Sequence, residues 1–440
     1  MQHSYESLDR PGSASFSPSG AKLLTPLRRR DFRVLWTGIA VSLIGDGIFL
    51  IAVAWEAYTL WNSPAALALV GIGMTVPTVL FLLPGGVLSD RHDRRRMMIA
   101  ADTLRGLAVA ALAALALTST LEMWQLVVLI AVYGIGTAFF TPAFDAVVPD
   151  LLPIEELPAA NALDQLVRPI AFRLAGPALG GVLVAASVGL AFAVDALTFG
   201  VSVIAVAAIR ARPKLANRAP ADPVQALREG FRFVRQRVWL WGTLVSAAVA
   251  YLVFMGPTEV LLPSIVKNEL HASPAVLGLV FAAGGLGAIG AAIVMGRRHH
   301  PRRDVTVMYV SWTLATLAVA GYGIAVAPWQ LMLACLVFNA LETVGTIVWA
   351  TMKQRHVPAA MLGRVSSLDW LISIGLLPIS FALTAPVAEA IGARATLVGA
   401  GVIGAVITLS ALYLPGMRAI EGQADETDET AVRPALSRAA

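Results

Sequence analysis

Apolar residues form twelve long, nearly unbroken runs along the chain. They cover residues 34–58, 66–88, 97–118, 123–146, 162–186, 189–209, 239–262, 273–295, 305–326, 329–351, 365–388 and 394–415. A helix that crosses a bilayer needs about 20 mostly apolar residues, and lipid tolerates Gly and Pro within it. Strands of a membrane barrel would instead alternate apolar and polar positions. The pattern predicts an all-α membrane protein with twelve transmembrane helices.

The polar segments divide the chain into two bundles of six helices, residues 34–209 and 239–415, joined by a cytoplasmic central loop at 210–238. The polar ends, residues 1–33 and 416–440, are predicted to be disordered cytoplasmic tails. The halves also resemble each other, because GGVLSDRHDRRR follows the second run and MGRRHHPRRD follows the eighth. Two pseudo-symmetric six-helix repeats around a midplane cavity are typical of transporters.

Composition and charge placement support a lipid environment. The chain is 57% hydrophobic and only 14% charged, whereas a soluble domain is about a quarter charged. Its net charge of +5 could suggest a nucleic-acid partner. However, Arg and Lys gather in every second gap between the runs, on one side of the predicted membrane. The loops on the other side hold only Lys267 and Arg394. This asymmetry predicts a multi-pass protein of the plasma (inner) membrane, with both termini in the cytoplasm and no nucleic-acid partner.

Ionisable residues inside the runs are candidate functional residues, because a charge in hydrocarbon is costly. Asp46 and Glu342 lie near the middle of their runs and are the first candidates for carrying a proton or binding a cation; a structural role is the alternative. Arg173 and Arg168 in the fifth run could pair with a carboxylate or contact an anionic substrate. Two carboxyl groups, Asp195 and Glu259, lie nearer the outer ends of runs six and seven. They could line an outer vestibule or have a structural role.

The charge cluster after the second run resembles the loop motif G-x-L-x-D-R-x-G-R-R of the major facilitator superfamily. The residues that match are Gly86, Leu88, Asp90, Arg91, Arg94 and Arg95, while Asp93 stands where the family has Gly. Together with twelve helices in two sets of six, the resemblance covers the whole membrane part of the chain. It implies the major facilitator fold and alternating access to a central site.

The resemblance also implies a gate at the cytoplasmic face. Asp90 would meet the start of the eleventh helix near Arg364–Ser367, where the helix N-terminus favours a carboxylate. The arginines of the motif would pair with Asp145 or Asp150. A role limited to setting the topology is the alternative.

A glycine-rich stretch in the fifth run resembles the G-P-x-x-G-G core of the drug:proton antiporters. It consists of Gly176, Pro177, Gly180 and Gly181, and Phe172 stands where the family has an earlier Gly. The alternative is that these glycines only allow close helix packing. Further stretches, SLIGDGIFLIAVAWEAY, GPTEVLLP and FAAGGLGAIGA, are similar to the branch that holds multidrug pumps and enterobactin exporters.

The sequence has none of the patterns expected of an enzyme. It has no Walker A loop, its six His are scattered, and it has a single Cys, Cys335, so we expect no metal and no cofactor. We expect a monomeric secondary transporter driven by the proton gradient. The first hypothesis is an exporter, by antiport, of small amphipathic molecules such as drugs or siderophore-like metabolites. The alternatives are a proton-coupled uptake symporter and a membrane receptor or scaffold that does not transport.

Overall fold

The computed structural model describes residues 24–153, 156–210, 223–297 and 303–421. Within these ranges, twelve helical segments are long and apolar enough to cross a membrane, which confirms the predicted number of spans. The N-terminal half comprises η1 (Thr25–Arg28), α2 (Arg30–Leu60), α3 (Pro64–Arg91), α4 (Arg94–Leu117), α5 (Met123–Leu151), α6 (Leu157–Arg168), η3 (Pro169–Ala175), α7 (Gly176–Ala186) and α8 (Val188–Ala207). The remainder comprises α9 (Pro223–Arg235), α10 (Val238–Ser264), η4 (Ile265–Glu269), α11 (Pro274–Arg297), α12 (Asp304–Ile324), α13 (Pro328–His356), α14 (Ala359–Gly375), α15 (Leu377–Ile391) and α16 (Ala393–Ala411).

Short polar connections set where the spans begin. Ser63 caps α3, because its side-chain oxygen accepts a hydrogen bond from the backbone N–H of Ala65 at 3.2 Å. Asp93 caps α4 in the same way and accepts from the N–H of Arg95 at 2.9 Å. Such caps satisfy backbone donors that have no partner inside the helix. Asp93, which departs from the family motif, therefore takes part in starting the third span.

Two of the spans are interrupted. The fifth consists of α6, the π-helical segment η3 and α7, and the change begins at Pro169, which has no N–H to continue the α-helical bonding. The eleventh consists of α14 and α15, which separate at Leu376, between Gly375 and the Pro378 at the start of α15. Breaks of this kind occur in membrane helices where the freed backbone faces protein or a cavity rather than lipid.

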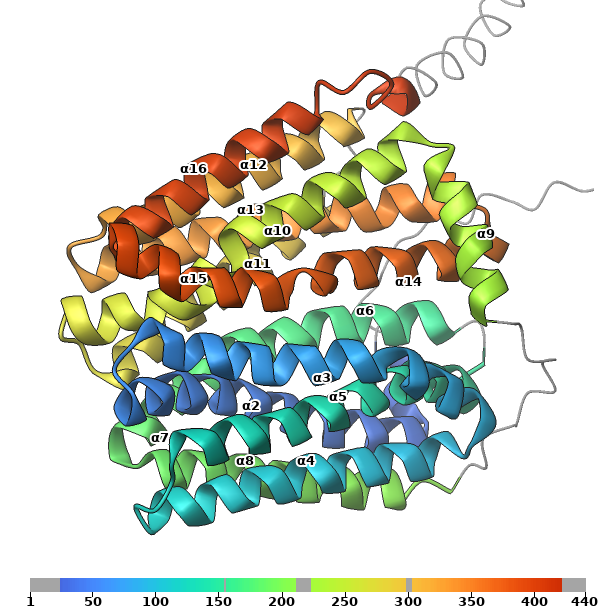
Figure 1. The fold of residues 1–440 in the computed structure, drawn as a ribbon. Helices are drawn as coiled ribbons and strands as arrows, with labels where there is room; N and C mark the ends of the chain where they lie inside the picture. The colour runs from blue at the N-terminus through green and yellow to red at the C-terminus, as the bar shows by residue number, and fades with distance from the viewer. Residues whose placement is uncertain (1–23, 154–155, 211–222, 298–302, 422–440) are drawn as a thin grey trace, which may run out of the picture.

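The two halves repeat one packing pattern. In the first, α2 packs on α7 and α8, α3 on α5, and α4 on α5 and α8. In the second, α10 packs on α15 and α16, α11 on α13, and α12 on α13 and α16. Figure 1 shows the blue-to-green half below the yellow-to-red half, with their helices running in similar directions. The sequence echoes between the halves thus correspond to a structural repeat.

The halves touch mainly through α7 and η3 against α11, and through α3 against α15. We call the end that carries Arg94, Arg95 and Arg297 the arginine-rich end, and the other the opposite end. At the opposite end, Tyr58 of α2 donates to the carbonyl oxygen of Val260 of α10 at 2.8 Å. Nearby, Lys267 donates to Thr59 at 2.8 Å. The buried apolar core is continuous across both halves here, so the molecule is closed at the opposite end.

The glycines of the fifth span lie where helices approach most closely. Gly176 packs against Gly47 and Gly180 against Ile48, both on α2. Gly181 faces Gly278 of α11 in the other half, and a Cβ at Gly278 would overlap the carbonyl oxygen of Pro177. Small residues allow helix backbones to approach closely in lipid, where packing rather than the hydrophobic effect joins helices. Close packing is therefore one role that the structure gives to this motif.

Three boundaries differ from the sequence prediction. The N-terminal tail was expected to be disordered to residue 33, but the chain is helical from Thr25. The central loop contains the helix α9. The C-terminal tail was expected to begin at 416, but Met417 is fully buried and Glu421 accepts from the N–H of Thr306 at 2.6 Å. Contacts with the bundle order these short polar segments, and composition alone does not report such contacts. Residues 1–23 and 422–440 of the predicted tails lie outside the described residues.

Candidate functional site

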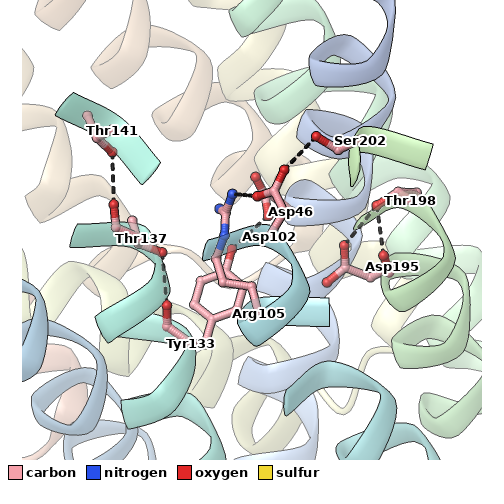
Figure 2. A network of polar contacts seen from close by, with 9 residues as sticks. All are labelled: Asp46, Asp102, Arg105, Tyr133, Thr137, Thr141, Asp195, Thr198 and Ser202. Atoms are coloured by element: carbon pink, nitrogen blue, oxygen red, sulfur yellow. Dashed lines mark hydrogen bonds and ion pairs between the residues drawn. The ribbon is translucent and has the colours of Figure 1, made fainter. Parts of the chain in front are cut away.

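Asp46 lies midway along α2 and is held by a tyrosine from another helix. Tyr133 of α5 donates its hydroxyl to Asp46 Oδ1 at 2.7 Å, as Figure 2 shows. The Tyr133 ring stacks on Phe49 with centroids 4.6 Å apart, so the tyrosine is fixed from both sides. The predicted carboxylate therefore faces the interior of the N-terminal half.

A buried ion pair lies beside Asp46. Arg105 of α4 donates through Nη2 to Asp102 Oδ1, and their side chains are only 6% and 0% exposed. Ser202 of α8 donates to the other oxygen of Asp102 at 2.6 Å. The Arg105 guanidinium also lies 4.5 Å from the centroid of the Phe140 ring, a favourable cation–π geometry. These contacts join α4, α5 and α8 at one place.

Asp195 is the third carboxyl group of this region, and its burial agrees with the structural alternative rather than with a place in an outer vestibule. It is 0% exposed and packs against α2, where a Cβ at Gly45 would overlap its Oδ1. Thr198 Oγ1 lies 3.2 Å from Asp195 Oδ1, while Oδ2 has no hydrogen-bond partner among the described residues. Position along the run left both alternatives open, because helix rotation, rather than depth along the helix, decides what a side chain faces.

We name these residues the N-half polar cluster, and it holds three carboxyl groups but one cation. Its members are Asp46, Asp102, Arg105, Tyr133, Asp195, Thr198 and Ser202. Buried charge without a counter-charge is very costly, and such groups neutralise instead. A cluster of this composition can take up and release protons. Asp102 and Arg105 were not among the predicted site residues, although opposite charges three residues apart within an apolar run are a signal for a buried pair.

A second polar group joins the two halves, and we call it the central bridge. Arg173 of η3 donates to Asn339 Oδ1 of α13 at 2.8 Å, and the same Nη1 lies 4.0 Å from Glu342 Oε2. Thr346 donates to Glu342 Oε1 at 2.8 Å. The side chains of Arg173 and Glu342 are 45% and 26% exposed, so water or a ligand can reach them. The structure thus unites two of the predicted site residues and adds Asn339.

A cavity of about 400 Å³ lies within the C-terminal half, between α10, α12, α13, α14 and α16, and we call it the C-half cavity. Its lining combines small and hydroxyl side chains with seven aromatic residues, Tyr251, Phe254, Tyr309, Trp312, Phe338, Trp349 and Trp370. Ligand sites are commonly such concave apolar surfaces with a few polar groups. Here Glu342 of the central bridge also lines the cavity, which connects the cavity to the junction of the halves.

An ion pair forms part of the same cavity wall. Lys353 of α13 donates to Asp369 Oδ2 of α14, and Trp349 Nε1 donates to that oxygen at 2.9 Å. The Lys353 and Asp369 side chains are 13% and 17% exposed. Neither Asp369 nor Lys353 was among the predicted site residues. Asp369 lies four residues inside the eleventh apolar run, and a charge at such a position was the signal that could have identified it.

Two further predicted residues have local roles. Arg168 lies at the end of α6 and pairs with Asp164 one turn earlier, with Arg168 Nε 3.3 Å from Asp164 Oδ2. The structural alternative therefore describes Arg168 in this state. Glu259 is half-buried on α10 beside Val260, the residue that accepts from Tyr58. Its role in a vestibule stays a prediction.

The gate motif lies at the arginine-rich end. Arg94 contacts Asp150 Oδ2 at 2.6 Å, so Asp150 is an acidic partner of the motif, as predicted, and Asp145 is exposed. Arg95 donates to the carbonyl oxygens of Val206, at 2.9 Å, and Ala207. Gly86 has open space where a Cβ would project. The side chains of Asp90 and Arg91 lie outside the described residues.

The eleventh helix does not begin where the gate prediction placed it. Its first segment, α14, begins at Ala359, so Arg364 is already inside the helix. Arg364 instead pairs with Glu229 of α9. The apolar run marked where the hydrophobic span starts, but the helix continues beyond the span on its polar side. The predicted helix start near Arg364–Ser367 is therefore wrong, while the contact of Asp90 with a helix N-terminus stays a prediction, because the Asp90 side chain lies outside the described residues.

The fold consists of two six-helix repeats that are joined by the central bridge and closed against each other at the opposite end, and the second repeat holds a cavity. This combination defines a transporter of the major facilitator superfamily. The sequence profile of the family described as "Transmembrane secretion effector" matches residues 21–438, and the chain belongs to that family. It is a multi-pass membrane protein and a secondary transporter.

Named relatives are similar over most of their length. Macrolide efflux protein A of Streptococcus pyogenes is 29% identical over 375 residues, covering 82% of this chain and 90% of that protein. The multidrug efflux pump Tap of Mycobacterium tuberculosis is 28% identical, covering 87% and 92%. Enterobactin exporter EntS of Citrobacter koseri is 28% identical, covering 77% and 80%.

Solved structures support the fold. A peptide transporter POT in complex with alafosfalin matches with a TM-score of 0.66 at 15% identity, covering 92% of this chain and 99% of that one. A bacterial homologue of the iron transporter ferroportin in an inward-facing state matches with a TM-score of 0.62 at 16% identity, covering 88% and 99%.

Proposed function

We propose that the chain is a proton-coupled exporter of small amphipathic molecules across the plasma membrane, with both termini in the cytoplasm. Relatives named as macrolide, multidrug and enterobactin efflux proteins support export. The Arg and Lys distribution supports placing the arginine-rich end in the cytoplasm. The opposite end, which is closed, would then face the outside, and substrate would enter from the cytoplasm.

The observation that carries this proposal is that Glu342 belongs to two sites at once. It lines the C-half cavity and belongs to the central bridge between the halves. A ligand or a proton that changes the charge around Glu342 therefore also changes the attraction across the junction. A ligand shifts a two-state equilibrium only by its differential interaction with the two states. Glu342 provides such a difference, because the Arg173 contact lies between elements that move apart in alternating access.

The cavity chemistry favours an amphipathic substrate of the kind that the relatives are named for. Aromatic rings of Tyr309, Trp312 and Trp349 supply apolar contact area, while Glu342 and Asp369 supply acceptors. Aromatic faces and carboxylates together can hold a molecule that combines an apolar body with hydrogen-bond donors or a cation. Macrolide-like drugs and siderophore-like metabolites are therefore the substrates to test first.

Asp46 is the proposed proton carrier, with Glu342 as the second candidate. Protonation of Asp46 would neutralise one of the carboxylates that attract the Arg105 guanidinium. The guanidinium would then be attracted only by Asp102 and Asp195. The helices α2, α4 and α8 carry these groups, so the proton changes forces among three helices of one half. The proton gradient would supply the energy for export.

The test is transport in proteoliposomes with an imposed pH gradient and a radiolabelled macrolide. Asp46→Asn should abolish gradient-driven transport, by on the order of 100-fold or more if proton transfer is lost, while the protein remains folded. Glu342→Gln should reduce both transport and substrate affinity. The matched control is Glu389→Gln, because Glu389 is an exposed carboxylate on α15.

Normal pumping by Asp46→Asn would refute the assignment of Asp46. The same assay decides the direction. Accumulation with the proton flow rather than against it would identify the uptake symporter instead. Substrate binding without any transport by the wild type would favour the receptor or scaffold.

A further inference from the structure

The helix α9, Pro223–Arg235, runs across the ends of the transmembrane helices rather than along them (Figure 1). Only Gln236 and Arg237 separate it from α10, which enters the apolar span at Val238. The first turn of α10 carries Trp241, which is exposed, and tryptophan is typical of the membrane–water interface. The short connection therefore holds α9 at the level of the lipid headgroups.

One face of α9 is fixed to the protein. Gly230 and Val234 are buried, and a Cβ at Gly230 would lie 3.2 Å from Arg364 Cβ and Leu368 Cδ1 of α14. Glu229 on the flank of this face pairs with Arg364. Residues four apart lie on the same side of a helix, so Gly230 and Val234 set the rotation of α9.

That rotation leaves the other face exposed and strongly basic. It consists of Arg228, Phe231, Arg232 and Arg235, spaced at three and four residues, and all four side chains are exposed. Phe231 is 57% exposed although it is a large apolar ring. A basic face with an exposed aromatic ring is the pattern of a helix that lies in the membrane interface.

We propose that this face, the α9 basic face, is a binding site for anionic phospholipids. The arginines bind headgroup phosphates, which their planar guanidinium groups match, and Phe231 inserts at the boundary of the acyl chains. The ligand is expected to be anionic, because three arginines face outward within about two helical turns and their charge complements that of a phosphate headgroup. Anionic lipids of the cytoplasmic leaflet attract basic residues close to the surface. The site does not depend on which molecule the protein transports.

The site is connected to the C-half cavity. Arg364, the partner of Glu229, lies on α14 little more than one turn before Asp369, which forms part of the cavity wall. Lipid held on α9 would therefore restrain the helix that carries Asp369. An anionic lipid can in this way regulate the cavity without entering it.

The experiment measures lipid contact at α9 in the full-length protein. Gln236→Cys, exposed next to α9, receives a thiol-reactive fluorophore, since the native Cys335 is buried. The protein is placed in phosphatidylcholine nanodiscs, and phosphatidylglycerol with brominated acyl chains is titrated in as the quencher. We expect quenching at low phosphatidylglycerol content, and weaker quenching at high salt because ions screen exposed charges.

The test variant combines Arg228→Gln, Arg232→Gln and Arg235→Gln. Each arginine near the surface contributes about fivefold in affinity, so the triple variant should need on the order of 100-fold more lipid for half-quenching. The matched control removes three exposed arginines elsewhere at the same end, by Arg297→Gln, Arg303→Gln and Arg418→Gln, and should leave the curve unchanged. If the triple variant does not fold, Arg232→Gln alone should shift the curve by about fivefold.

Identical curves for the wild type and the α9 variant would overturn the proposal. So would equal quenching by brominated phosphatidylcholine, because the site would then not distinguish anionic lipid. A soluble acidic protein as the true partner of α9 would give the first of these results.

Discussion

The two halves pack their helices in the same way, yet they place their charges differently. In the N-terminal half, Asp102 and Arg105 are 0% and 6% exposed, and they are enclosed by α4, α5 and α8. In the C-terminal half, Glu342 is 26% exposed and faces a cavity of about 400 Å³. The N-terminal half has thus enclosed this ion pair, while the C-terminal half leaves Glu342 within reach of a ligand.

The difference separates two tasks on one architecture. Enclosed charges interact strongly because the surroundings screen them little, and removing one partner leaves an uncompensated charge. Charges that line a cavity can exchange protein partners for water or a ligand at smaller cost. The N-half polar cluster therefore fits the proposed proton carriage, and the C-half cavity fits the proposed binding of substrate. The central bridge connects the two tasks through Arg173 and Glu342.

The largest expected effect follows from removing the only cation of the N-half polar cluster. Arg105→Leu leaves Asp102 buried without its ion-pair partner, and should lower the free energy of unfolding by about 3–5 kcal/mol. Reversible unfolding in mixed micelles measures the change. The matched control is Arg168→Leu, which breaks a half-exposed pair and should cost about 0–1 kcal/mol. Equal losses in the two variants would show that the cluster is not electrostatically special.

A smaller effect is expected from the equivalent change in the C-half cavity. Asp369→Asn keeps the side-chain volume but removes the charge that Lys353 and Trp349 contact. We expect a loss of about 1.5–3 kcal/mol in the free energy of unfolding, the usual contribution of a hydrogen bond to a charged group. Unlike Arg105→Leu, this variant should also change substrate affinity, measured by equilibrium binding in detergent. Unchanged binding would remove Asp369 from the site.

The smallest effect concerns an exposed pair at the arginine-rich end. The Arg29 guanidinium donates two hydrogen bonds of 2.9 Å to Glu156, and these lower the pKa of Glu156 below its usual value. A lowered carboxyl pKa means that the pair stabilises the fold above the ordinary pKa of Glu, about 4.3, and that this stabilisation is lost as the pH falls through the lowered value.

The stability difference between the wild type and Glu156→Gln should therefore be small at neutral pH and vanish in acid. Thermal unfolding over a pH series measures it. A difference that grows toward acid pH would contradict the assigned direction.

The sequence by itself determined the features that depend on local composition. Twelve apolar runs of sufficient length specify twelve helices, and the polar gaps specify where most of them begin and end. The long polar segment at 210–238 specified the division into two sets of six, and the motif around Arg94 and Arg95 specified the superfamily. These properties follow from the length and apolar composition of each segment, which decide separately for each segment whether it can cross the lipid.

Only the tertiary structure decided which side chains meet. The spans are apolar nearly all round, so no strong amphipathic pattern reveals which face turns inward. Helix rotation then brought Asp46 to Tyr133, buried Asp195 against α2, and joined Arg173 to Asn339 and Glu342 across the two halves. In lipid, that rotation is set by close contacts between small residues such as Gly181 and Gly278 on separate helices, which depend on shape complementarity rather than on the composition of either segment.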